Sequence, residues 1–337
     1  MCVGLYWLRF IAVAACVIFE SAGLSRAETA EMAKRGQITL EVLGRFETGD
    51  FDGLEAMANG FMTTDKRSPS GLWNISHFDS ALSDVLEIDD PESGEWKVFD
   101  EMIARWRAKY PNSSNARLAY AHMLHGHAWS YRGDGYANTV LKENWQPFYD
   151  RLQTTLNFLD EQKNFLQGDP RYHALLLRFL NESQVSESDY DAAADRALDL
   201  HHGYYPLYFE IAFHYAPKWG GDPTAIEAFA RNAVMRTKAT DGLGLYARIY
   251  WSMEQSQFGE AMFQVSEVRW PDMKQGIMDV LKNYPDQWNI NNFAKFACLV
   301  GDKEYAKTLV GQITVVVPRA WSGAVGFEDC KAWAEAG

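Results

Sequence analysis

YYPLYFEIAFHYAPKWGGDPTAIEAFA, residues 204–230, contains the signals of two helices and of the turn between them. Pro206 fits the first turn of a helix, where its missing N–H would have no helical partner. Gly220 and Gly221 predict that this helix stops, because glycine adopts positive φ at little cost. Asp222 can then cap the next helix, with a proline just inside it. The stretch predicts two helices joined by a tight turn.

Helical spacing dominates the rest of the chain. Apolar residues recur at intervals of three and four, as in Phe99, Met102, Ile103 and Trp106, which is the period of one helix face. Alternating strand patterns are scarce, and the breaks between helical segments contain no long low-complexity linker. The sequence therefore predicts an all-α fold in which residues 28–337 form a single domain.

A degenerate repeat supports a more specific architecture. Each copy has a glycine or serine turn, an aspartate expected at the helix N-cap and a helix with small residues that permit close packing. The second and third copies lie about 33 residues apart, close to the tetratricopeptide period, and the others are irregularly spaced. The expected architecture is an irregular tetratricopeptide-like helical repeat array, an α-α superhelix. The four expected capping residues are Asp50, Asp189, Asp222 and Asp302.

The first 27 residues resemble an export signal. Arg9 closes a short basic region, ten apolar residues follow, and small residues precede a cleavage point after Ala27. The apolar run is too short for a spanning helix, which needs about 20 residues. The alternative is lipidation at Cys16, although apolar residues follow this cysteine where a polar tether is expected. We expect a signal peptide over residues 1–27 and a periplasmic or secreted protein.

Cleavage leaves two cysteines, Cys298 and Cys330. In an oxidising compartment such a pair can form a disulfide, and the alternative is two buried free thiols in helices. The sequence leaves both alternatives open.

Charge and composition limit the classes of partner. The formal net charge is −13 and aromatic residues make up 14% of the chain. This charge argues against nucleic acid and against docking on anionic lipid, and it suits a cationic or neutral partner. After cleavage the chain has no expected transmembrane span. The sequence contains no G-x-S-x-G, P-loop or G-x-G-x-x-G motif, and we expect no cofactor.

Several segments together carry a family resemblance. Tyr204 to Tyr208, Pro217-Lys218-Trp219-Gly220-Gly221 and Phe327-Glu328-Asp329-Cys330 are its most characteristic parts. On these residues the chain resembles the bacterial domain-of-unknown-function family 4034, whose members look like irregular tetratricopeptide-type helical proteins. The resemblance covers most of the chain after residue 27. It implies a helical fold and no assigned activity, so it provides no catalytic residue.

Three short segments are candidate sites. His122 and His125 share a helix face and could hold Zn²⁺ if a third ligand joined them; packed histidines are the alternative. Trp129, Tyr131 and Arg132 group at a helix end, where Arg132 could bind a carboxylate or instead cap the terminal carbonyls.

The turn at Lys218 and Trp219 is the third candidate. An exposed tryptophan beside a cation is typical of an interface anchor. The alternative is a tryptophan that fills the gap between two helices, with both glycines required by the turn.

We predict a helical-repeat protein of the cell envelope that binds a protein or peptide or serves as a structural module. The alternative is an all-helical enzyme acting on extracellular glycan, with an α/α-barrel-like arrangement and aromatic sugar platforms. Two carboxylates facing each other across a deep aromatic cleft would favour the enzyme. A groove without convergent acids would favour the binding protein.

Overall fold

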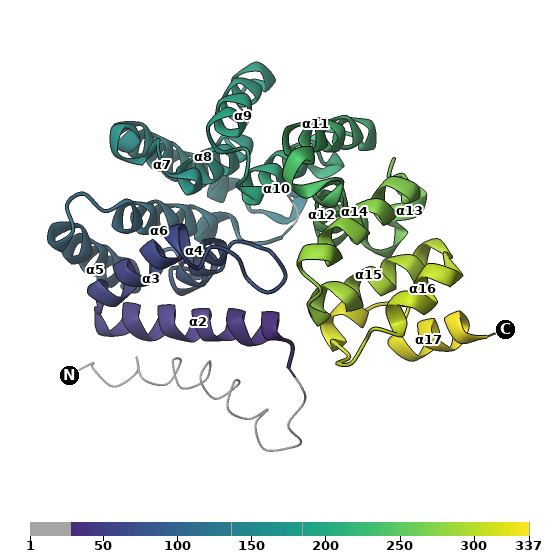
Figure 1. Ribbon diagram of the computed structural model, residues 1–337. Helices are drawn as coiled ribbons and strands as arrows, with labels where there is room; N and C mark the ends of the chain where they lie inside the picture. The colour runs from purple at the N-terminus through teal and green to yellow at the C-terminus, as the bar shows by residue number, and fades with distance from the viewer. Residues whose placement is uncertain (1–27, 136, 184, 337) are drawn as a thin grey trace.

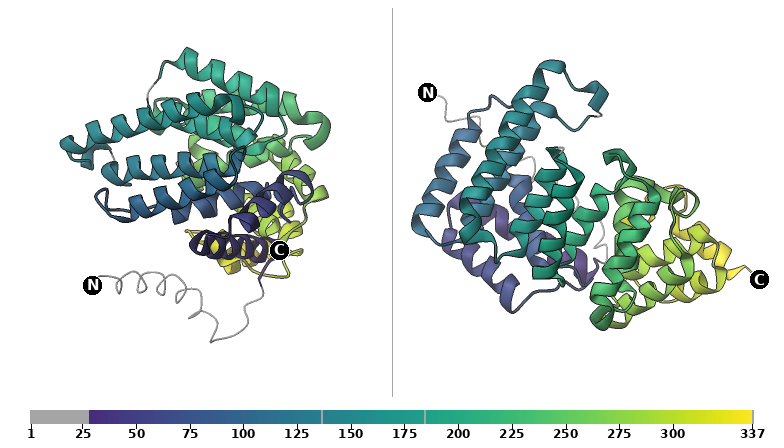
Figure 2. Two further views of the ribbon diagram at one scale, coloured as in Figure 1. Left: turned by 90° about the vertical axis from the view of Figure 1, so that its left-hand side faces the viewer. Right: turned by 90° about the horizontal axis from the view of Figure 1, so that it is seen from above.

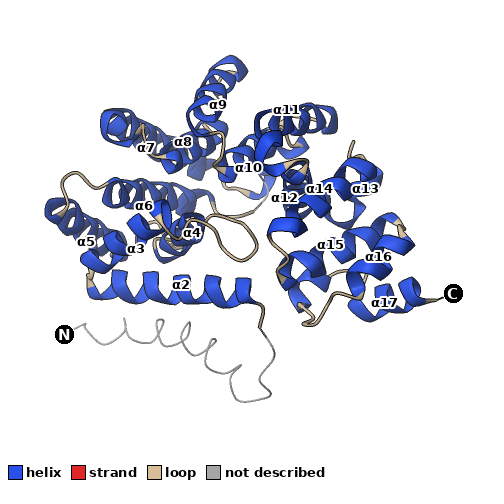
Figure 3. Cartoon of the chain, viewed as in Figure 1, coloured by secondary structure: helices blue, strands red, loops and turns tan. Residues whose placement is uncertain are grey.

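The computed structural model describes residues 28–337, apart from residues 136, 184 and 337. The predicted signal peptide and the alternative lipidation site, Cys16, lie outside the described residues. The described part is helical and contains no strand, which confirms the predicted all-α class (Figure 3). None of the described helices is long and apolar enough to span a membrane.

The first half of the described chain contains six α-helices, and the 3₁₀ turns Ala137–Thr139 and Lys142–Asn144 lie before the last of them. In chain order these helices are α2 (Ala30–Thr48), α3 (Phe51–Thr63), α4 (Asn74–Val85), α5 (Glu95–Lys109), α6 (Ser114–Arg132) and α7 (Trp145–Leu166).

The remaining helices are interrupted by a π-helical turn, Glu254–Phe258, and by the 3₁₀ turns Pro217–Trp219, Gly259–Ala261 and Pro318–Trp321. In chain order they are α8 (Pro170–Glu182), α9 (Glu187–His201), α10 (Tyr205–His214), α11 (Pro223–Asp241), α12 (Gly244–Met253), α13 (Met262–Val265), α14 (Trp270–Asn283), α15 (Gln287–Val300), α16 (Lys303–Val310) and α17 (Phe327–Glu335).

Local capping chemistry sets many of the helix starts. Asp50, Asp222 and Asp302 each accept a hydrogen bond from the first turn of their helices, as the repeat predicts. The prediction for Asp189 is wrong. The N-cap of α9 is Ser186, whose hydroxyl accepts from the N–H of Asp189, so the aspartate already lies in the first helical turn.

Residues 204–230 fold as their sequence predicts. Pro206 lies in the first turn of α10, and Asp222 caps α11, which begins at Pro223. Between the helices, Gly220 has φ of 97°, in the left-handed region that glycine favours. A Cβ on Gly221 would lie 2.1 Å from the carbonyl oxygen of Tyr215, so both glycines are needed by the turn.

Successive helices pack as neighbours and form a curved array. Figure 1 shows α7, α9 and α11 on the outer side of α6, α8, α10 and α12. In Figure 2 the N-terminal helices gather on one side of the molecule and the C-terminal helices on the other. Helix α2 packs against both α4 and α15, so the beginning of the described chain contacts its C-terminal part. One hydrophobic cluster runs from Ile38 to Ala334.

Candidate functional site

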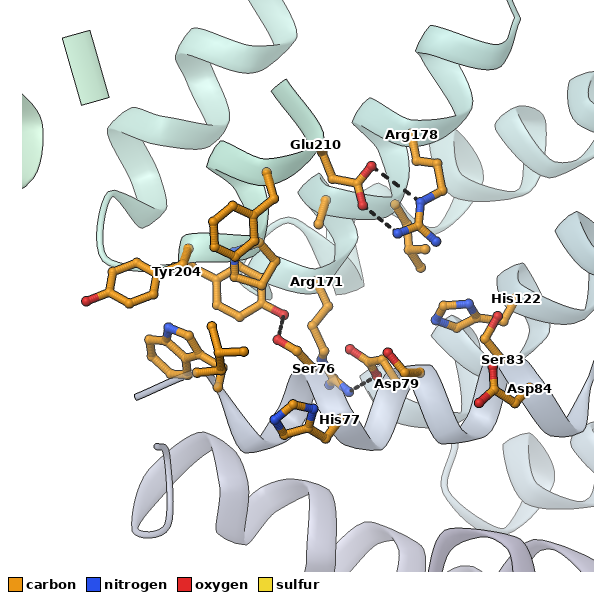
Figure 4. Close-up of a pocket in the computed structure, with 18 residues that line it drawn as sticks. Ser76, His77, Asp79, Ser83, Asp84, His122, Arg171, Arg178, Tyr204 and Glu210 are labelled. Atoms are coloured by element: carbon orange, nitrogen blue, oxygen red, sulfur yellow. Dashed lines mark hydrogen bonds and ion pairs between the residues drawn. The ribbon is translucent and has the colours of Figure 1, made fainter. Parts of the chain in front are cut away.

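A polar cavity of about 410 Å³ opens between α4, α6, α8 and α10 (Figure 4). This volume is typical of pockets that hold small ligands or single side chains. Carboxylates, guanidinium groups, hydroxyls and imidazoles line it together with Trp73, Tyr204, Tyr205 and Phe209. The cavity therefore combines charged and hydrogen-bonding groups with apolar and aromatic walls.

Helix α4 presents a polar face to this cavity because its polar residues follow the helical period. Ser76, Asp79, Ser80 and Ser83 recur at intervals of three and four and all line the cavity. The opposite face of the helix is buried in the hydrophobic cluster. One amphipathic helix thus supplies both packing and most of the hydroxyls of the site.

Arg171 forms the buried base of the cavity. It follows Asp169 and Pro170, which start α8, and its side chain is only 3% exposed. Its guanidinium contacts Asp169 at 2.7 Å and Asp79 at 3.2 Å, and it donates to Asn115. Burial raises the pKa of Asp79 to about 6, against the lowering effect of Arg171, and Asp169 adds to the rise. One guanidinium therefore serves two carboxylates.

Arg178 lies seven residues after Arg171, on the same face of α8. Its Nε and Nη2 donate to the two carboxylate oxygens of Glu210 on α10, a fork-like pairing that ties the two helices together. Glu210 raises the pKa of Arg178, so this guanidinium stays charged. Both oxygens of Glu210 are occupied by this arginine.

His122 reaches the cavity from α6 and is only 5% exposed. Neither of its ring nitrogens has a hydrogen-bond partner among the described residues. Burial, with a smaller effect of the nearby Arg178 and His125, lowers the pKa of His122 to about 3. His122 is therefore a neutral imidazole with a donor and an acceptor, neither of which the protein satisfies.

Two further cavities continue from the first. A cavity of about 200 Å³ shares Leu72 and Phe209 with it and is lined also by Arg248 and Trp251. A third cavity, of about 360 Å³, shares Gln255 and Trp288 with the second. Because neighbouring cavities share lining residues, the three lie side by side in a row from α4 to α15. We call this surface the inner groove.

The predicted histidine pair does not converge. His122 faces the cavity, whereas Nε2 of His125 lies 2.8 Å from Oε2 of Glu182 and its ring stacks on Phe179. Among the described residues, no group of three histidine, cysteine or acidic side chains is placed to hold a metal ion.

The aromatic group at the end of α6 lies outside the inner groove. The indole nitrogen of Trp129 donates to Glu182 at 3.2 Å, and the Tyr131 hydroxyl donates to Glu92 at 2.7 Å. Arg132 lies over the Trp129 ring and donates to the carbonyls of Gly133 and Gly135. All three side chains are engaged within the fold.

Lys218 and Trp219 also lie away from the inner groove. The Lys218 ammonium lies 3.9 Å from the centre of the Phe213 ring, and Trp219 packs on the same ring. Trp219 is partly buried against the main hydrophobic cluster. These contacts are those of a tryptophan that fills the gap between two helices.

Cys298 and Cys330 are bonded as a disulfide that joins α15 to α17, with a Cα–Cα distance of 5.8 Å. The sulfurs do not line the inner groove. The bond fastens the last described helix to the body of the fold.

Sequence reasoning missed most of the cavity. Asp79, Arg171, Arg178 and Glu210 were not among the predicted site residues. One signal was present: two arginines seven residues apart share one face of a helix whose neighbouring positions are largely apolar. Charged side chains on such a face are rarely buried without a partner, so their spacing predicts a polar cluster.

No family model, curated protein or solved structure matches the chain. The resemblance to family 4034 therefore stays a prediction, and the site must be interpreted from its own geometry.

Proposed function

We propose that the chain is an exported helical-repeat protein that binds an extended peptide segment of a partner protein in its inner groove. The observation that carries this proposal is the row of three adjacent cavities, which share Leu72 and Phe209 at one junction and Gln255 and Trp288 at the other. A row of adjacent cavities suits successive side chains of one extended segment better than a single compact ligand. Helical arrays commonly bind partners on such surfaces.

The chemistry of the acids favours binding over glycan hydrolysis. A hydrolase of that class needs two carboxylates free to act on the substrate. Both oxygens of Glu210 are held by Arg178, and Asp79 contacts Arg171. Glu210 is therefore fully engaged and Asp79 is shared with Arg171, which leaves Asp84 as the cavity carboxylate without an ion pair among the described residues, so we rank the glycan-active enzyme second.

Selection from a random dodecapeptide display library on the purified protein tests the proposal. The informative variant is Gln255→Trp, because Gln255 is exposed where the second and third cavities meet. Its matched control is Met235→Trp, at a position 75% exposed on α11 and outside the groove lining.

We expect the wild type and Met235→Trp to retain the same peptides, and Gln255→Trp to bind them at least about tenfold more weakly. Two results would overturn the proposal: no peptide enriched above an unrelated control protein, or equal binding by both tryptophan variants. Release of reducing sugars from cell-wall glycan by the wild type, without peptide binding, would favour the enzyme instead.

A further inference from the structure

Negative charge exceeds positive charge around the first cavity. Arg171 is shared by Asp79 and Asp169, while Arg178 and Glu210 neutralise one another. Asp84, at the rim, has a carboxylate that no donor contacts among the described residues. The buried group of Asp79, Asp169 and Arg171 therefore has one negative charge without a counter-charge, and such a charge is costly to bury.

Asp79 is the member of this group that lines the cavity. Its Oδ1 contacts Arg171, whereas its Oδ2 has no hydrogen-bond partner among the described residues, and its side chain is 15% exposed. Figure 4 shows the Asp79 carboxylate between Arg171 and the side of the cavity where His122 lies. An acceptor oxygen of a partly compensated carboxylate is thus accessible to a ligand.

His122 adds an independent indication of a ligand. A side chain that is only 5% exposed, with both ring nitrogens unpaired, faces the same cavity. Its neutral imidazole offers one acceptor nitrogen to an N–H donor. Unsatisfied buried polar groups are rare in folded proteins, so both ring nitrogens are open to an occupant of the cavity that can pair with them.

We propose that the first cavity receives the cationic side chain, lysine or arginine, of the peptide bound in the inner groove. The ammonium or guanidinium group donates to Oδ2 of Asp79 and to the imidazole of His122, and Tyr204 and Phe209 form aromatic walls around it. The inference rests on the proposed function, and the net charge of −13 favours such a partner at long range.

A metal ion is a poorer occupant than an organic cation. Among the described residues no three suitable side chains are close enough to coordinate one ion. A lysine or arginine head group needs only spaced acceptors, which Asp79 and His122 supply from two different helices.

The first experiment uses small probes and does not depend on peptide binding. Binding of n-butylammonium chloride, sodium butyrate and n-butanol to the purified protein is followed by ligand-observed NMR at constant ionic strength. The informative variant is Asp79→Asn, and the matched control is Asp195→Asn, a position 73% exposed on α9. A second informative variant, His122→Phe, keeps the test available if Asp79→Asn fails to fold.

We expect n-butylammonium to bind the wild type and Asp195→Asn, and to bind Asp79→Asn and His122→Phe at least about tenfold more weakly. Preference for butyrate, or unchanged n-butylammonium binding by the two cavity variants, would overturn the inference.

The second experiment uses the selected peptides, each compared with a version in which norleucine replaces lysine. Enrichment of lysine or arginine at one position, with about tenfold weaker binding after replacement by norleucine, supports the inference. Selected peptides without such a residue would overturn it and leave the proposed groove function standing. Amine binding without any selected peptide would overturn the groove function and leave only a preference of the first cavity for organic cations.

Discussion

Arg248 donates from its Nη2 to the backbone carbonyl oxygen of Ser70 at 2.6 Å, although 178 residues separate them. Asn289 on α15 donates to the same oxygen at 3.0 Å, and the N–H of Ser70 donates to Glu31 on α2. The segment between α3 and α4 therefore connects the N-terminal helices to α12 and α15. This segment also supplies Leu72 to the junction of two cavities, so the same contacts position part of the inner groove.

Replacement of Arg248 by alanine tests this connection. Arg248 is 4% exposed, and the variant leaves a cavity and removes a charged donor. We expect the free energy of unfolding in urea to fall by roughly 2–3 kcal/mol. Arg248→Met, which keeps much of the volume and removes a buried charge, should lose less. An alanine variant as stable as the wild type would show that Ser70 is held without Arg248.

Gly71 should not tolerate a side chain. Its φ is +86°, and a Cβ there would lie 2.6 Å from the Tyr284 ring and 2.7 Å from Arg248. Backbone strain and overpacking together should cost Gly71→Ala roughly 2–4 kcal/mol of unfolding free energy. Gly301→Ala is the control, because Gly301 has φ of +82° with no atom near its Cβ position. Thermal and urea unfolding should show a clearly smaller loss for the control.

His122 should make the fold sensitive to acid. Its folded pKa of about 3 lies below the ordinary value of 6.5, so the unfolded chain takes up this proton first. The stability contributed by neutral His122 is complete above pH 6.5 and decreases as the pH falls toward 3, by at most about 1.4 kcal/mol per pH unit.

His122→Leu should remove that slope. Urea unfolding of the wild type and the variant at pH 7, 6, 5 and 4 measures it, with His202→Leu at an exposed position as the control. Parallel pH profiles for the wild type and His122→Leu would contradict a buried neutral imidazole.

The disulfide should stabilise the C-terminal part of the fold. Cys298 and Cys330 are 32 residues apart in sequence, and closing a loop of that size in the unfolded chain corresponds to about 4 kcal/mol. We expect a similar loss for the double variant Cys298→Ala/Cys330→Ala, and for the wild type in dithiothreitol. The double variant itself should not respond to dithiothreitol. A reductant-insensitive wild type would contradict the stabilising role.

The turn and the helix starts within residues 204–230 could be predicted from the sequence, whereas the capping residue of α9 could not. Pro206, Gly220 and Asp222 lie where their chemistry predicts, because first-turn prolines, left-handed glycines and capping aspartates act within a few residues. Asp189 shows the limit of such reasoning. Ser186 competes with it as a cap, and both residues satisfy the same local pattern three positions apart.

The candidate site was largely beyond sequence reasoning. His122 and His125 share a helix face in projection, yet one faces the cavity and the other contacts Glu182. The difference depends on which neighbouring helix covers each side chain. Helical spacing gives the same signal for a residue that lines a groove and for one that packs in a core.

The sequence by itself determined the helical class and several of the helix starts, because propensity, periodicity and capping are interactions between near neighbours. Only the tertiary structure decided that Asp79, His122, Arg171 and Glu210 surround one cavity. These residues come from four helices, and burial in a shared cavity determines how they pair. Packing between segments distant in sequence creates that environment, and no local pattern encodes it.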